Sequence, residues 1–290
     1  MAIFEQYLWL FPLSSALLGL IIGSFLNVVI HRLPIMMERQ WRLDCADTFP
    51  ESGLAKPEGQ FNLSQPCSHC TKCNKSIKII DNIPIVSWLV LKGRCRSCLA
   101  SISWRYPFVE LITALMSLFT AIQFGPNLYC FAALIFLYAL IALLFIDLDT
   151  MLLPDQITLP LMWLGITLSL MEISPTSLQD SVLGAIFGYL SLWSVYWVFK
   201  LATGKEGMGY GDFKLLAVLG AWLGWQYLPM IILCSSIVGV FMAIAQLALK
   251  GKALNQAFPF GPYLAISGWI ALTWGCPLKT TDAADEEKGG

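Results

Sequence analysis

Charged side chains are scarce in this chain of 290 residues. Asp, Glu, Lys and Arg make up 13% of the sequence, compared with about 25% in soluble globular domains. Hydrophobic residues make up 57%, and the mean hydropathy is +0.67. This composition excludes an ordinary soluble protein and predicts an all-α polytopic membrane protein that lies in a lipid bilayer.

The long hydrophobic runs predict about eight transmembrane helices, given that one span takes about 20 residues. Gly and Pro divide two of the runs into pairs. The first run has neither a basic segment before it nor a small-residue cleavage site after it, so we expect a permanent helix and not a cleaved signal. The runs cover 11–30, 111–146 (divided at 125–127), 156–171, 181–199, 215–249 (divided at 224–229) and 253–278. The short acidic tail, 280–290, is expected to be disordered.

The segment 31–105 differs from the rest because it is polar and has no spanning run. It holds 11 of the 18 Lys and Arg residues and only six acids. The positive-inside rule therefore places it in the cytoplasm and the N-terminus outside. Its basic residues are scattered and form no stripe, so no nucleic-acid partner is expected. The predicted organisation is a first transmembrane helix (1–30), a cytoplasmic loop domain (31–105), a helical membrane domain (106–279) and the tail (280–290).

Six of the nine cysteines lie in this loop, and four of them form two Cys-x-x-Cys pairs, Cys70 with Cys73 and Cys95 with Cys98. Paired knuckles at this spacing predict one tetrahedral structural zinc site. A loop that can bury little core of its own needs such a cross-link. Cys67 forms an overlapping pair with Cys70, and His69 is a competing ligand, so the part played by these two stays open. A thiol-redox role ranks second, because no βαβ pattern surrounds either pair.

Acidic residues interrupt the apolar runs at two places. Asp147 is expected at the C-terminus of the third helix, where the helix dipole disfavours a negative charge, and Asp212 at the start of the sixth. Both fall on the predicted cytoplasmic side. Two carboxylates brought together in apolar surroundings share a proton, which suits general acid and base catalysis. The alternative for Asp212 is a helix cap, and for Asp155 we accept that alternative.

A glycine-rich stretch precedes Asp212. Gly207, Gly209 and Gly211 lack a Cβ atom, so they permit unusual backbone angles and the close approach of an extended peptide. They are the candidate substrate-binding loop. Asp149 is expected to tune the charge of the site, and Lys214 is a further auxiliary candidate.

The motifs in combination resemble a type IV prepilin peptidase over about residues 18–275. They are Gly23-Ser24-Phe25-Leu26-Asn27-Val28-Val29, Arg32-Leu33-Pro34, the two cysteine knuckles, Asn82-Ile83-Pro84, Ser87-Trp88, Lys92-Gly93-Arg94-Cys95-Arg96, Arg105-Tyr106-Pro107-Phe108-Val109-Glu110, Asp147-Leu148-Asp149, Leu153-Pro154-Asp155 and Gly209-Tyr210-Gly211-Asp212-Phe213-Lys214.

The resemblance implies an aspartic protease of the GxGD type in the bacterial inner membrane, with Asp147 and Asp212 as the catalytic pair. Such enzymes remove the short basic leader of type IV prepilins and pseudopilins on the cytoplasmic side. They usually also methylate the new N-terminal amine with S-adenosylmethionine. The sequence holds no glycine-rich fingerprint of a soluble methyltransferase, so it names no residue for this cofactor.

A transporter and an assembly scaffold are the two alternative classes of protein. A proton-coupled transporter with a regulatory zinc loop would use intramembrane acids as a relay. Transporters often show internal repeats and acids near mid-helix, whereas here no repeat is evident and the acids lie at helix borders. An assembly scaffold would tolerate the loss of both acids. Cleavage of a prepilin-like peptide separates these classes from a peptidase.

Overall fold

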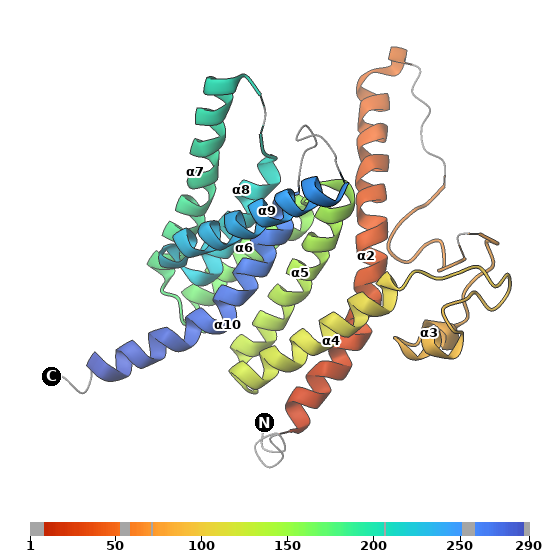
Figure 1. The fold of residues 1–290 in the computed structure, drawn as a ribbon, viewed down its shortest axis with the longest axis horizontal. Helices are drawn as coiled ribbons and strands as arrows, with labels where there is room; N and C mark the ends of the chain where they lie inside the picture. Colours follow the sequence, from red (N-terminus) through yellow and green to blue (C-terminus); the bar gives the residue numbers. More distant parts are fainter. Residues whose placement is uncertain (1–8, 53–58, 71, 206, 251–258, 287–290) are drawn as a thin grey trace. The chain divides into compact units, whose positions relative to one another are not determined.

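The computed structural model describes residues 9–52, 59–70, 72–205, 207–250 and 259–286. These residues are helical or irregular and form no strand, with only two isolated β-bridges. A helix lies in each of the eight predicted segments, over the residues that the structure describes (Figure 1). Five segments are long and apolar enough to span a membrane, which agrees with a polytopic membrane protein. They lie in α2 (Leu10–Thr48), α4 (Arg105–Phe124), α5 (Leu128–Thr150), α7 (Leu178–Thr203) and α9 (Leu228–Lys250, whose span is counted as Trp225–Met242).

The chain forms two compact units, residues 1–126 and 127–290. Unit 1 contains α2, the short helices η1 (Pro50–Ser52), η2 (Ile79–Asn82) and α3 (Val86–Val90), and α4. Unit 2 contains α5, α6 (Asp155–Leu170), α7, α8 (Tyr210–Leu223), η3 (Trp225–Tyr227), α9 and α10 (Gly261–Glu286). The boundary differs from the predicted one at 105, because α4 packs on α2 and so belongs to the first unit.

Helices α2 and α4 pack closely because α2 presents glycines to α4. A Cβ atom at Gly19 would lie 2.9 Å from the Cα of Ala114, and one at Gly23 would lie 2.8 Å from the Cα of Glu110. Either contact is too short for a real side chain. The small residues of the first hydrophobic run therefore serve helix contact.

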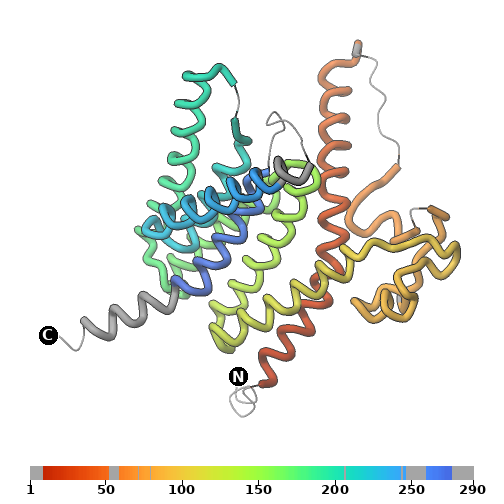
Figure 2. Tube along the Cα trace, viewed as in Figure 1, coloured from red at the N-terminus to blue at the C-terminus, as the bar shows by residue number. Residues whose placement is uncertain are grey.

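Helix α2 is longer than the predicted span, which was expected to end at Ile30 (Figure 2). It continues through Pro34 to Thr48. At about 1.5 Å per residue its 39 residues exceed the roughly 30 Å of a bilayer core. The added part is rich in helix formers and contains the ion pair of Glu38 with Arg42 at 2.6 Å, so one internal proline does not end it.

The core of unit 2 is α8, which contacts α6, α7 and α10. All its residues from Asp212 to Leu223 are buried except Lys214. At 14 residues α8 is too short to cross a bilayer core by itself at about 1.5 Å per residue, and α6 has only 16. Eight full spans therefore stay a prediction. Helix α10 continues to Glu286, so the tail predicted to be disordered is helical over 280–286, while 287–290 lie outside the described residues.

Candidate functional site

Two buried aspartates lie at helix ends within unit 2. Asp147 is 4% exposed in the last turn of α5, and Asp212 is 7% exposed in the first turn of α8. They are close enough for the negative charge of Asp147 to act on the Asp212 carboxylate. Oδ2 of Asp147 and Oδ1 of Asp212 are buried without a hydrogen-bond partner among the described residues. Buried polar atoms are normally partnered, so this pair is a candidate for chemistry.

The local sequence sets both positions. Met151 takes a left-handed conformation that ends α5, and its N–H donates to the carbonyl oxygen of Asp147 at 2.9 Å. Asp147 therefore lies at the negative end of its helix, as predicted. Gly209, and not Asp212, is the N-cap of α8. The dipole of α8 thus favours a negative charge on Asp212, whereas the dipole of α5 disfavours a negative charge on Asp147.

The three glycines of the predicted substrate loop have different surroundings. A Cβ atom at Gly211 would lie 2.8 Å from Cβ of Leu153, so this glycine lets α8 approach the connection between α5 and α6. A Cβ atom at Gly207 would lie 2.9 Å from the ring of Phe199. Beside Gly209, the nearest atoms lie at 4.0 Å and include Oδ2 of Asp212. The open space is therefore at Gly209, next to the carboxylate, and substrate binding there stays a prediction.

The two auxiliary candidates have different surroundings, and their roles stay predictions. Asp149 is exposed at the end of α5. Lys214 donates from Nζ to both carboxylate oxygens of Asp155, each at 2.7 Å. The interpretation of Asp155 as a helix cap is wrong: Pro154 is the N-cap of α6, without a side-chain cap bond, and Asp155 links α6 to α8 through this ion pair.

This ion pair leads to a testable expectation. Both side chains are partly exposed, at 30% for Lys214 and 51% for Asp155, so the pair should contribute about 1 kcal/mol or less to stability. We expect Lys214→Ala and Asp155→Ala to lower the melting temperature slightly and equally, and the double variant to lower it no further than either one. Melting in detergent and peptide cleavage are the measurements. Loss of cleavage in Lys214→Ala alone would show that Lys214 acts on the site and not through Asp155.

The four predicted zinc ligands meet in unit 1. The sulfur atoms of Cys70, Cys73, Cys95 and Cys98 all lie within 4.8 Å of one another. The two knuckles have the same backbone pattern. The amides of Cys70 and Cys95 donate to the carbonyls of Lys75 and Ala100, at 2.9 and 2.8 Å, and each knuckle is followed by a residue with positive φ, Asn74 at 53° and Leu99 at 57°.

The cysteine cluster fits a zinc ion. Four thiolates at about 2.3 Å from a tetrahedral ion are about 3.8 Å apart, and the Sγ atoms of Cys70 and Cys98 are 3.8 Å apart. Backbone hydrogen bonds from Cys73 and Lys72 lower the pKa of the Cys70 thiol to about 6. Those from Cys98 and Ser97 likewise lower the pKa of Cys95. The first cysteine of each knuckle thus favours the thiolate form that metal binding requires.

Neither Cys67 nor His69 joins this cluster. Both are exposed, and Nδ1 of His69 lies 3.0 Å from the carbonyl oxygen of Cys67. Arg96 of the second knuckle fixes its position by another contact. Its guanidinium group donates hydrogen bonds to both carboxylate oxygens of Asp81. Arg96 lowers the pKa of Asp81, so this ion pair persists at neutral pH.

Two buried ionic residues, Arg32 and Glu110, bind the loop to its helices, and the sequence alone indicates no such role for them. Arg32 of α2 is 8% exposed and donates to the carbonyls of Asn62, Leu63 and Pro66 at 2.6 to 3.3 Å. Glu110 of α4 accepts from the amide of Ile85 at 2.7 Å. Both belong to motifs of the family resemblance, Arg32 to Arg32-Leu33-Pro34 and Glu110 to the motif that begins at Arg105. The sequence does not show, however, which carbonyl or amide group an ionic residue beside an apolar run binds.

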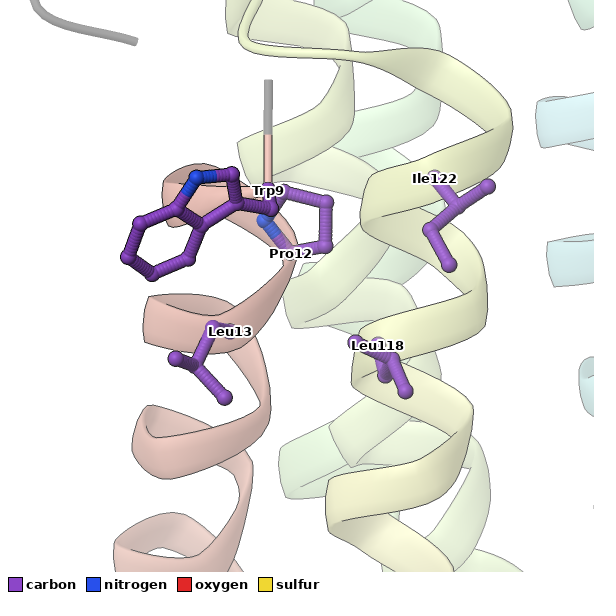
Figure 3. A pocket seen from close by; sticks show the side chains of 5 residues that line it. All are labelled: Trp9, Pro12, Leu13, Leu118 and Ile122. Atoms are coloured by element: carbon purple, nitrogen blue, oxygen red, sulfur yellow. The ribbon is translucent and has the colours of Figure 1, made fainter. Parts of the chain in front are cut away.

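S-adenosylmethionine does not fit either of two hollows that the described residues form. One lies between α2 and α4 and is lined by Trp9, Pro12, Leu13, Leu118 and Ile122, all apolar (Figure 3). A second, in unit 2, is too small for a nucleoside and is also mainly apolar. Sites for polar cofactors converge several polar groups on the ligand, which neither hollow provides. The structure therefore assigns no residue to the methyl donor.

These features define an α-helical membrane protein with a buried carboxylate pair, the arrangement of an aspartic peptidase. Residues 17–124 match the Bacterial Peptidase A24 N-terminal domain, and residues 134–244 match the Type IV leader peptidase family. The chain belongs to the type IV leader peptidase family and is an enzyme.

Similar proteins extend over nearly the whole chain. A prepilin leader peptidase/N-methyltransferase of Aeromonas hydrophila is 56% identical over 267 residues, which cover 92% of each chain. A protein with the same description from Pseudomonas aeruginosa is 51% identical, and the match covers 93% of each chain. One from Pectobacterium carotovorum is 48% identical, and the match covers 91% of this chain and 95% of the relative. No solved structure matches.

Proposed function

We propose that this chain cleaves the basic leader from type IV prepilins and pseudopilins, with Asp147 and Asp212 as its catalytic pair. The observation that carries the proposal is the burial of both carboxylates at helix ends, each with one oxygen that has no hydrogen-bond partner in the part of the chain that the structure describes. The family membership of the chain supplies the reaction and the class of substrate. The experiment that tests it is cleavage of a prepilin-like peptide by the purified full chain in detergent.

The chemistry follows from two carboxylates that share one proton. The ionised group takes a proton from a water molecule, whose oxygen attacks the carbonyl carbon of the scissile peptide bond. The protonated group gives its proton to the leaving amine as the C–N bond breaks. The leader leaves with a new carboxyl group and the pilin with a new amine. One proton enters the pair and one leaves it, so the pair returns to its starting state.

The substrate must reach the pair as an extended segment, because only an extended backbone exposes its carbonyl to both groups. The space beside Gly209 supports entry there. Among the described residues other than its two chain neighbours, the one side chain within 4 Å of a Cβ atom at that position is the carboxylate of Asp212. Leu153 is partly exposed next to Gly211 and offers an apolar contact. The basic leader then lies on the cytoplasmic side of the inner membrane, where the positive-inside rule places the loop of unit 1.

Zinc is proposed as a structural cross-link held by Cys70, Cys73, Cys95 and Cys98. A closed set of four thiolates leaves no open position for a substrate, so the metal would stabilise the loop and take no part in cleavage. Neither a transporter nor a scaffold is favoured for a chain of a peptidase family.

The second proposed activity is N-methylation of the new amine, as in the names of the relatives. Methyl transfer needs a positioned amine but no proton-sharing carboxylates. We therefore expect Asp147→Asn to keep methylating a pre-cleaved pilin peptide, and loss of Cys95 and Cys98 to reduce methylation more than proteolysis. An assay with pre-cleaved peptide and labelled methyl donor measures this. Equal loss of both activities in every variant would argue for one shared site.

A further inference from the structure

The N-terminus of α10 forms a third side of the carboxylate pair within unit 2. A Cβ atom on Gly261, the first residue of α10, would lie 2.7 Å from Oδ2 of Asp147 and 3.2 Å from its Cγ. The backbone amide of Gly261 also interacts with the Asp147 carboxylate. The amide of Gly261 therefore interacts with the buried Asp147 side chain, and the absence of a side chain at Gly261 leaves room for the Asp147 carboxylate.

The next residues of α10 offer no competing donor. Pro262 has no N–H. The amides of Tyr263 and Leu264 donate to the carbonyl of Phe260, at 3.1 and 3.3 Å. Among the described residues of this turn, the amide of Gly261 is the one with no backbone partner, and it lies against the Asp147 carboxylate, which is only 4% exposed. The positive end of α10 offsets the unfavourable position of Asp147 at the negative end of α5.

Leu153 connects this contact to the other aspartate. Its Cδ1 atom would lie 3.2 Å from a Cβ atom on Gly261, and its Cβ atom 2.8 Å from one on Gly211. Two glycines on two helices therefore pack against one leucine side chain. Any side chain at position 261 would push against Asp147 and Leu153 together.

We propose that Gly261 is a positioning residue of the peptidase site, whose amide orients the Asp147 carboxylate and whose missing side chain leaves Oδ2 the space to exchange the shared proton. The inference rests on the proposed function. It assigns Asp147, which faces an amide and a helix N-terminus, as the ionised base, and Asp212 as the acid. Among the charged groups on neighbouring elements, Asp212 of α8 feels the negative charge of Asp147, and Asp155 of α6 is paired with Lys214.

The test compares Gly261→Ala with Gly275→Ala in the full chain. The two changes are matched, because a Cβ atom at Gly275 of the same helix would lie 2.7 Å from the ring of Tyr227, away from the aspartates. For Gly261→Ala we expect kcat for a prepilin-like peptide to fall about a hundredfold with KM within about threefold, since small misplacement of a catalytic group costs about that much. Gly275→Ala should cleave at close to the wild-type rate.

The pH profile of kcat/KM distinguishes positioning from general strain. The added methyl group of Gly261→Ala would push the Asp147 carboxylate away from the amide, because a Cβ atom there would lie 2.7 Å from Oδ2. A carboxylate moved off an amide donor keeps its proton to higher pH, so the acidic limb of the Gly261→Ala profile should move upward. Pro262→Ala adds an N–H to the same turn without added bulk, and its acidic limb should move downward, which tests the idea even if Gly261→Ala does not fold. Profiles for both variants that coincide with the wild type would overturn the inference.

Failure of this inference and failure of the proposed function give different results. If Asp147→Asn is inactive while Gly261→Ala cleaves like Gly275→Ala, only the role of Gly261 is wrong. If Asp147→Asn itself cleaves normally, the catalytic pair is wrong.

Discussion

Asp147→Asn is expected to lower leader cleavage by at least about a thousandfold while the protein stays folded and inserted. The amide keeps the shape of the side chain but is unable to accept and return a proton, and general acid–base catalysis alone contributes about 10²–10⁴-fold. Asp149→Asn is the matched control, two residues further along the same helix and exposed. It removes the same charge and should retain most of the activity. Initial rates on a prepilin-like peptide, with melting temperatures for both variants, measure the difference.

An equal loss in the two variants would contradict this account. It would mean that the charge of the segment, and not the buried position of Asp147, matters for cleavage. A normal rate in Asp147→Asn would remove this residue from the reaction.

Loss of the metal is expected to have the second large effect. Purified protein should contain about one zinc per chain if the four thiolates close one tetrahedral site. Cys73→Ser or Cys98→Ser should lose the ion and unfold the loop, because α3 buries none of its residues and structural zinc contributes on the order of 10 kcal/mol in small domains. Zinc content by mass spectrometry and protease sensitivity of the loop are the measurements.

Cys67→Ser is the control, since Cys67 is exposed and lies outside the cluster. It should change neither zinc content nor protease sensitivity. Full zinc retention in a Cys70→Ser, Cys73→Ser double variant would mean that other residues hold the metal.

The sequence was sufficient to predict the helical class, because apolar runs and their Gly and Pro breaks are local properties. It also predicted the four cysteines of the cluster, whose spacing within each knuckle lets one turn present both thiols. Asp147 was recognisable since its position at a helix C-terminus runs against the dipole. Each of these signals lies within a few residues of the feature that it predicts.

The missed features depend on contacts between distant segments. The change to polar residues after Ile30 indicated a helix end, but Pro34 costs α2 only one backbone bond and the following helix formers maintain the helix. The partner of Asp155 is Lys214 on another helix, and nothing local to Asp155 indicates it. Gly261 was absent from the predicted site because hydrophobic periodicity does not show which helix N-terminus meets Asp147.

The most direct test of the central claim is the fate of a prepilin-like peptide with a basic leader, incubated in detergent with the purified wild-type chain or its Asp212→Asn variant. Mass spectrometry of the products identifies the bond that is cut. The account predicts a single cut at the leader boundary by the wild type and no detectable cut by Asp212→Asn at equal zinc content. Cleavage by Asp212→Asn at the wild-type rate, or none by the folded wild type, would contradict it.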